Sequence, residues 1–217
     1  MAEIEFCEIT DRHDNIAIVA SGPSARGFSA PPGVTVIAVN GAVEWLEPAP
    51  GYWFTLDPGH RNRSRMLNRR DGTVYIAAVP VGFGTQKAPL HVMRLPAPAG
   101  VRYMQRMAGN GALSARPGLS DDPRRIHTGN GAYGALGLAY LMGATRIALF
   151  GVDASHARRI EGGRSSNLDH LPALFATAAS QLDGAGVEVV NASPGSAIEC
   201  FPKMTMGDAL QWLSTNW

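Results

Sequence analysis

The sequence is poor in cysteine and in long apolar runs, and it carries almost no net charge. Its two cysteines, Cys7 and Cys200, are too few and too far apart to form a disulfide framework, so reduced thiols are expected. No run approaches the roughly 18 apolar residues that cross a bilayer. The first residues, MAEIEFCEITDRHD, lack the basic and apolar regions of a secretion signal. These absences favour a cytoplasmic protein without a membrane span.

Several common site motifs are also missing. A formal net charge of +1 argues against a chain that is basic throughout, as many nucleic-acid-binding proteins are. No histidine pair stands at zinc-ligand spacing from cysteines, and no G-x-S-x-G elbow or Cys–His signature supports covalent hydrolysis. Glycine and proline, at 25 and 15 residues, are plentiful instead. Such a composition is typical of many tight joints between strands and helices.

Short apolar runs alternate with helix-like segments along the chain. The expected strands are Asn15–Ala20, Val34–Val39, Tyr52–Leu56, Thr73–Val79, Arg146–Phe150 and Val187–Asn191. The expected helices are Gly41–Leu46, Arg61–Arg70, Gly129–Met142, Leu171–Leu182 and Thr205–Leu213. Near-continuous Val, Ile, Ala and Leu in the strands is typical of a parallel sheet that is covered on both faces. The alternation predicts an α/β fold: a single Rossmann-like domain over 1–217, with a mostly parallel sheet and helices on both faces.

Two segments depart from this regular alternation. Between Gly129 and Met142, small and apolar residues surround the whole helix, which predicts a helix buried against the sheet. The segment 80–125 shows recurrent glycine and proline with little periodicity, and we expect an irregular insertion there that covers or completes a site.

Polar or glycine-bearing turns follow most of the expected strands. Ligands of doubly wound sheets bind outside the carboxyl ends of the strands, so these turns are expected to converge on one nucleotide-sized pocket. The residues concerned are Ser21, Gly22, Asn40, Asp57, Asp153, Asn191 and Ser193, joined by Thr128, Gly129 and Asn130 at a helix start.

Each of these turns has a structural interpretation beside the functional one. The amides of Ser21 and Gly22 could meet a phosphate, although SGPSA is also an ordinary strand exit and is neither G-x-G-x-x-G nor a P-loop. Thr128 or Asn130 could cap a helix whose free amides also attract an anion, and the two roles are compatible. Asp57 could bind a ribose hydroxyl or a divalent ion, or form an Asx-turn before Pro58.

The stretch HRNRSRMLNRR is the one strongly basic segment. Arg61, Arg65 and Arg69 recur at four-residue spacing and are expected to share one helix face. Such a face is either simply solvated or a patch for the phosphates of a ligand or a nucleic acid.

In order and spacing, IAIVASGPSA, VIAVNGAVEWL and HTGNGAYGALGLAYLMGATRIALFGVDAS resemble a Rossmann-like superfamily with two branches. One branch comprises bacterial lipooligosaccharide-type sialyltransferases, which bind a CMP-sugar. The other comprises 6-hydroxymethylpterin pyrophosphokinases and their relatives. The resemblance covers most of the chain outside 82–125. It implies nucleotide contacts at Ser21, Gly22, Asn40 and Thr128–Asn130, and contacts to the base or ribose near Asn191–Ser193.

The resemblance also bears on the chemistry. WFTLDPG, with Asp57, is more similar to the pyrophosphokinase branch, in which this aspartate lies near phosphates and magnesium. The position of the sialyltransferase general base, a histidine, is held here by Arg164, and the phosphate-binding tyrosines are replaced by the segment ASHARRIEGG. Arginine neutralises a phosphate but does not accept a proton. The expected phosphate ligands are therefore Arg158, Arg159 and Arg164, and the expected base is Asp153, His156 or His170.

Three functions are compatible with the sequence. The first is a transferase, glycosyltransferase-like, that uses a nucleotide-sugar donor. The second is a pyrophosphokinase-like enzyme that uses ATP, with magnesium held by Asp57 and Asp153. The third is a non-catalytic accessory protein that binds a nucleotide, or a nucleic acid through Arg61, Arg65 and Arg69. The acceptor and the oligomeric state are left open.

Overall fold

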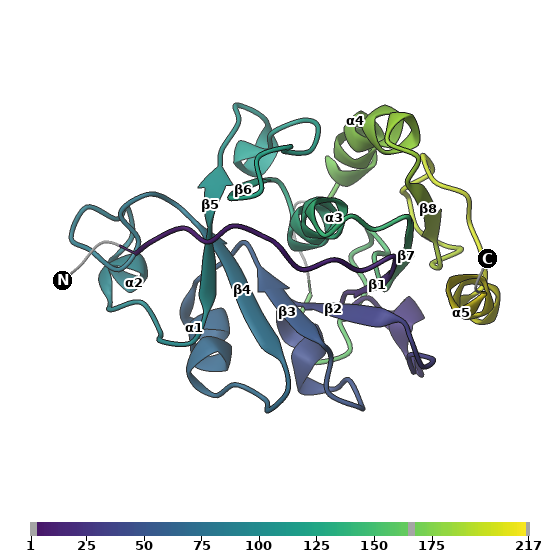
Figure 1. Cartoon of the computed structure of the whole chain (residues 1–217), viewed down its shortest axis with the longest axis horizontal. Coiled ribbons are helices and arrows are strands. Elements are labelled where there is room, and N and C mark those ends of the chain that lie inside the picture. Colours follow the sequence, from purple (N-terminus) through teal and green to yellow (C-terminus); the bar gives the residue numbers. More distant parts are fainter. Residues whose placement is uncertain (1–3, 165–167, 216–217) are drawn as a thin grey trace.

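The computed structural model describes residues 4–164 and 168–215. Within these residues, eight strands form one sheet in the order β6-β5-β4-β3-β2-β1-β7-β8, and every neighbouring pair is parallel (Figure 1). The strands are β1 Asn15–Val19, β2 Thr35–Val39, β3 Tyr52–Thr55, β4 Val74–Val79, β5 Arg102–Met107, β6 Arg125–His127, β7 Arg146–Phe150 and β8 Glu188–Asn191. The α/β fold with a parallel sheet is confirmed.

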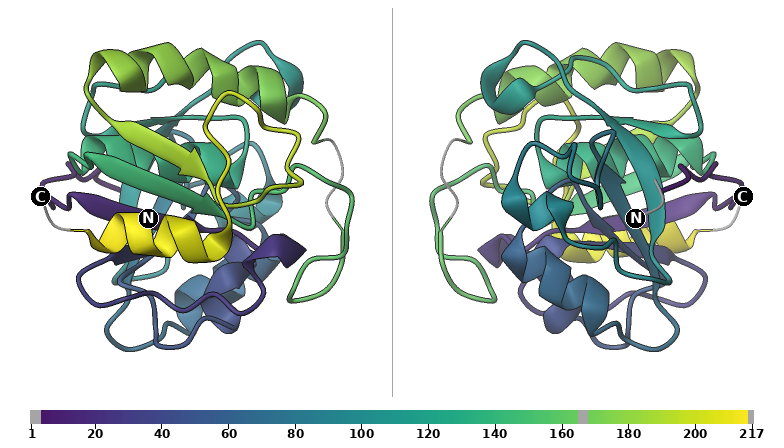
Figure 2. Two further views of the ribbon diagram at one scale, coloured as in Figure 1. Left: turned by 90° about the vertical axis from the view of Figure 1, so that its right-hand side faces the viewer. Right: turned by 90° about the vertical axis from the view of Figure 1, so that its left-hand side faces the viewer.

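Helices cover both faces of the sheet, as predicted (Figure 2). The α-helices are α1 His60–Leu67, α2 His91–Arg94, α3 Gly131–Leu141, α4 Leu171–Gly184 and α5 Met206–Ser214. Leu136 of α3 and Phe175 of α4 belong to the core on one face, whereas Met66 of α1, Met93 of α2 and Leu213 of α5 belong to the core on the other. In the described part of the chain, every helix is too short or too polar to cross a membrane.

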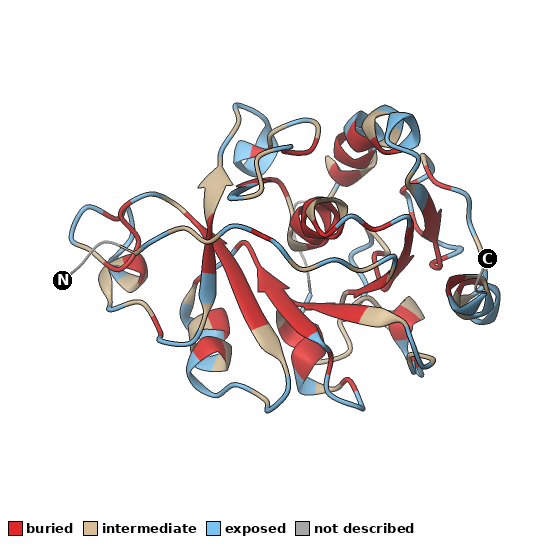
Figure 3. Cartoon of the chain, viewed as in Figure 1, coloured by how far each residue is buried: buried red, intermediate tan, exposed pale blue. Residues whose placement is uncertain are grey.

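The central strands and α3 are buried (Figure 3). All residues of β7 are buried, and so is every residue of α3 from Ala132 to Ala139, which confirms the prediction of a buried helix. A Cβ at Gly134 would lie 2.8 Å from Phe54 Cε1 on β3. The glycine therefore lets the helix backbone approach the sheet closely.

The segment 80–125 was expected to be irregular, and this expectation is wrong in part. It contributes α2, the strand β5 and the short 3-10 helix Ala112–Ser114, and β6 begins at its end. The two strands lie at one end of the sheet, where β5 has an exposed first residue and three half-buried last residues. Because such strands need no continuous apolar run, their sequences, RYMQRM and RIH, did not reveal them.

Two helices also differ from the expectation. The segment predicted as a helix over Gly41–Leu46 is a 3-10 helix, η2, over Asn40–Glu44. Helix α1 ends at Leu67, three residues before the predicted end at Arg70, and Asn68 donates to the carbonyl of Ser64 in its last turn. Another 3-10 helix, η1, spans Pro23–Ala25 in the turn after β1.

The order of the strands reverses at β1. From β1 the chain adds strands in one direction as far as β6, and it then returns along α3 to place β7 on the other side of β1. The hydrogen bond from Ala20 N to Phe150 O, 2.8 Å long, continues the pairing of β1 and β7 past their carboxyl ends. This boundary is the topological switch point of the sheet.

Candidate functional site

A pocket lies at the switch point, between the carboxyl ends of β1, β2 and β7 and the N-terminus of α3. Ligands of doubly wound sheets bind at this place. The structure brings together here six of the residues that the sequence singles out. They are Ser21, Gly22, Asn40, Asn130, Asp153 and Arg159.

The other predicted site residues lie outside the pocket lining. They are Asp57, Thr128, Gly129, His156, Arg158, Arg164, His170, Asn191 and Ser193. His156 Nε2 is 3.5 Å from Asp169 Oδ1 on the exposed loop before α4, and His170 Nε2 is 3.1 Å from Gly129 O. Neither predicted histidine lines the pocket in this structure.

The turn after β1 binds the carboxylate of Asp153 instead of offering free amides to a phosphate. Gly22 N donates to Gly151 O over 2.9 Å, and Ser24 N donates to Asp153 Oδ2 over 3.2 Å. The hydroxyl of Ser24 donates to the other oxygen of Asp153. The Gly22 amide is therefore already used within the chain, and the contact of Gly22 with a nucleotide stays a prediction.

The segment after β8 contacts Ser24, the residue that binds Asp153. Ser193 Oγ lies 2.7 Å from Ser24 Oγ, so it orients the residue that holds Asp153. Asn191 is fully buried, and its side chain accepts from Ser193 N and donates to Ile198 O. These contacts satisfy Asn191 within the chain.

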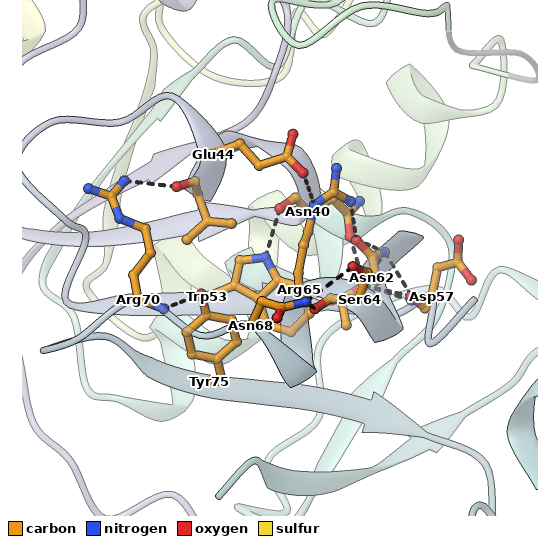
Figure 4. Close-up of polar contacts among 12 residues, drawn as sticks. Asn40, Glu44, Trp53, Asp57, Asn62, Ser64, Arg65, Asn68, Arg70 and Tyr75 are labelled. Atoms are coloured by element: carbon orange, nitrogen blue, oxygen red, sulfur yellow. Dashed lines mark hydrogen bonds and ion pairs between the residues drawn. The ribbon is translucent and has the colours of Figure 1, made fainter. Parts of the chain in front are cut away.

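Asn40 is oriented by a polar network that reaches α1 (Figure 4). Its backbone is left-handed, with φ of 52°, and its carbonyl accepts from Trp53 Nε1 over 2.7 Å. Its Oδ1 accepts from Thr55 Oγ1 at 2.7 Å and from Asn62 Nδ2 at 3.1 Å. Its Nδ2 faces the start of α3, since a Cβ at Gly131 would be 2.9 Å from it. The network therefore directs an amide donor toward the N-terminus of α3.

The N-terminus of α3 carries a glycine motif that the sequence interpretation missed. Gly129, Gly131 and Gly134 have the spacing G-x-G-x-x-G and follow the strand β6. In nucleotide-binding sites these glycines permit a tight turn, a close approach of backbone to phosphate, and close packing of helix on strand. Gly131 lines the pocket, and Gly134 packs on β3. The motif was visible in HTGNGAYG.

One residue of this motif region caps helix α3, and two others pack against neighbouring segments. Asn130 is the N-cap, and its Oδ1 accepts from Ala132 N over 2.8 Å. Thr128 is buried and donates to Ser114 O, while Gly129 approaches Leu174 of α4 so closely that a Cβ has no room. The Thr128 hydroxyl thus donates to the backbone of the segment before β6, and its contact with a ligand stays a prediction.

Asp57 forms an Asx-turn, the structural alternative considered for it. Its Oδ1 accepts from Gly59 N over 2.9 Å, just ahead of α1. Nearby, burial lowers the pKa of the Arg106 guanidinium, and the carboxylate of Asp57 partly opposes this shift. Within residues 4–164 and 168–215, no three His, Cys, Asp or Glu side chains are arranged to hold a metal ion.

The predicted basic face of α1 does not form. Arg65 is 12% exposed, and its Nε pairs with Glu44 Oε1 at 2.9 Å, whereas Arg69 lies beyond the end of the helix and donates to Ala99 O. Arg61 is exposed near the loop after β7. The expectation of a shared face is wrong because the helix ends at Leu67 and Arg65 turns inward.

Two polar atoms buried in the pocket lining have no hydrogen-bond partner in the described part of the chain. They are the hydroxyl oxygen of Ser21 and Oε2 of Glu161. Ser21 is 8% exposed. Sequence reasoning missed Glu161, because it stands in the loop after β7 between an isoleucine and two glycines and belongs to no motif. An unsatisfied buried polar group is costly, and two others in the described chain, Trp45 Nε1 and Arg63 Nη1, lie outside the pocket.

Comparisons with known proteins give a relationship of fold. No family model matches the chain, and no curated protein matches it. A solved structure, the MAf glycosyltransferase from Magnetospirillum magneticum AMB-1, is similar with a TM-score of 0.56 and 14% sequence identity. The match covers 95% of this chain and 36% of that protein, so the chain spans about a third of its length. At this identity the likeness shows a shared α/β fold, and the resemblance to sialyltransferases and pterin pyrophosphokinases stays a prediction.

Proposed function

We propose that the protein is a nucleotide-dependent transferase, glycosyltransferase-like, which binds a nucleotide-sugar donor in the switch-point pocket. The position of the pocket supports this, because doubly wound sheets bind nucleotides there. The similar fold of a solved glycosyltransferase supports the reaction class.

The observation that carries the proposal is the Ser21 hydroxyl. It is buried at the end of β1, lines the pocket and has no partner in the described chain. Leaving a hydroxyl unpaired costs about 1–3 kcal/mol, so such a group persists where a ligand supplies the missing hydrogen bond. A phosphorylated nucleoside carries suitable donors and acceptors.

The phosphate is assigned to the α3 side of the pocket. The helix N-terminus is electropositive, Gly131 lines the pocket beside it, and Asn40 Nδ2 packs against Gly131. Arg159 adds a cationic residue to the lining. In the transfer, an acceptor hydroxyl oxygen bonds the anomeric carbon and gives its proton to Asp153, the one of the expected bases that lines the pocket. The bond from that carbon to the phosphate oxygen breaks, and the phosphate leaves with the electron pair, stabilised by these groups.

Calorimetric titration of CMP, UDP, GDP and ATP, each with and without magnesium, tests the proposal. We expect at least one to bind below millimolar levels, and we expect Ser21→Ala to weaken binding without lowering the thermal midpoint. Ser196→Ala is the matched control, since Ser196 donates to Val152 O over 2.8 Å and its loss lowers the midpoint. The proposal is wrong if no nucleotide binds the wild type. Magnesium-dependent turnover of ATP to AMP would instead favour a pyrophosphokinase, and nucleotide binding without any turnover would favour an accessory protein.

A further inference from the structure

Glu161 places a carboxylate oxygen that has no hydrogen-bond partner in the described chain in the lining of the pocket. Its Oε2 is buried and has no hydrogen-bond partner in the described chain. Its other oxygen packs over Gly41 on η2, where a Cβ would lie 2.5 Å from Glu161 Cδ. The side chain therefore fits only because position 41 has none. Glu161 is half-buried as a whole, but a buried carboxylate oxygen without a partner is costly, so this arrangement suggests that a ligand completes it.

The backbone fixes Glu161 at this position. The preceding residue, Ile160, donates its amide to Ser21 O over 3.0 Å and packs against the core below the sheet. On the other side, Gly162 N donates to Arg159 O over 3.0 Å and closes a tight turn. The loop itself arches past the carboxyl ends of the strands (Figure 2). Glu161 thus stands beside Ser21, the other unsatisfied residue of the pocket.

The second carboxylate of the lining, Asp153, already has hydrogen-bond partners within the chain. Both of its oxygens accept hydrogen bonds from Ser24. A hydroxyl donor in the pocket therefore finds an acceptor oxygen without any partner at Glu161, whereas each oxygen of Asp153 already accepts one hydrogen bond. A phosphate is repelled by both carboxylates and attracted by the N-terminus of α3, which orients a ligand carrying both kinds of group.

We propose that Glu161 accepts a hydrogen bond from a sugar hydroxyl of the bound nucleotide, whose phosphate lies at α3. This rests on the proposed function and adds a specificity-determining residue to it. The hydroxyl has two chemical sources, the ribose of the nucleotide and the sugar attached to its phosphate. Both present the same donor to the same oxygen.

The test compares ligands that differ in hydroxyl groups. The probes are CMP, UDP, GDP and ATP with their 2′,3′-dideoxy counterparts, and UDP-glucose and GDP-mannose against UDP and GDP. Hydrogen bonds to charged groups contribute enough that Glu161→Ala is expected to weaken binding of the hydroxylated ligand at least about tenfold. The dideoxy ligand is expected to lose nothing if ribose is the source. If the attached sugar is the source, only the sugar conjugates lose affinity.

A second readout needs no ligand. Glu161→Gln keeps the shape and removes a half-buried charge that has one unpaired oxygen, so the thermal midpoint of the free protein is expected to rise by about 2–4 °C. Glu188→Gln is the matched control, because Glu188 is an exposed glutamate at the amino end of β8. We expect it to leave the thermal midpoint unchanged. A fall in the midpoint of Glu161→Gln contradicts the proposal, because it indicates a structural role for the charge.

The outcomes separate the two proposals. If no probe binds the wild type, the proposed function fails and this inference fails with it. If probes bind and Glu161→Ala weakens all of them equally, or weakens none of them, sugar conjugates included, only the role of Glu161 is overturned.

Discussion

Gly22 has no room for a side chain, and substituting it tests how closely β1 and β7 are joined at the pocket. A Cβ on Gly22 would contact Gly151 O and would lie 2.5 Å from Asp153 Oδ2. The backbone of Gly22, with φ of −65°, suits any residue, so Gly22→Ala introduces a steric change alone.

The loss of stability expected for Gly22→Ala follows from these distances. The carboxylate distance is roughly 1 Å inside the optimal separation of non-bonded atoms, and the second clash is with backbone that cannot rotate away. Overpacking of this kind costs about 1–3 kcal/mol. For a chain of this size each kcal/mol lowers the thermal midpoint by about 2–4 °C, so we expect a fall of roughly 2–12 °C.

Thermal and urea unfolding of the free protein measure the effect, and calorimetry measures the accompanying loss of nucleotide affinity. Gly195→Ala is the control, because Gly195 also lies in a turn after a strand and a Cβ there meets nothing within 4 Å. Equal midpoints for the two variants would refute the reasoning, since they would mean that the exits of β1 and β7 separate without cost.

Three further predictions concern groups elsewhere in the fold. Asn62 is 5% exposed and donates to Asp57 O over 2.7 Å, so Asn62→Ala should lower the free energy of unfolding by about 1–3 kcal/mol in urea titrations; an unchanged value would contradict the network of Figure 4. Burial raises the pKa of the Cys7 and Cys200 thiols, so maleimide should label the native protein more slowly than the unfolded chain at pH 7. Labelling of the native protein should become faster as the pH rises, and equal rates for native and unfolded chains would count against this prediction. Burial also raises the pKa of the Tyr103 and Tyr133 phenols in the native state, which therefore keeps protons that the unfolded chain releases. The stability from these phenols is complete below about pH 10 and is lost as the pH rises further, which tyrosinate absorbance and urea midpoints at pH 9 to 11 would detect.

Much of the candidate site could be anticipated because strand ends of a parallel sheet share one edge. The turns that carry Ser21, Asn40 and Asp153 follow clear apolar strands, and these residues meet in the pocket. Asp57 follows an equally clear strand, yet its carboxylate caps the turn into α1. Local sequence does not distinguish these outcomes, since both use the same residue type at the same kind of position.

The sequence by itself determined the elements: the apolar runs NIAIV and RIALF specify buried parallel strands, and the small residues of α3 specify a helix packed against them. These signals are local, because burial on both faces leaves its pattern in each segment. Only the tertiary structure decided that β7 returns to the side of β1, that Arg65 and Arg69 bond within the chain instead of sharing a face with Arg61, and that Glu161 enters the pocket. Strand order and loop placement depend on contacts between residues far apart in the chain, and no single segment records them.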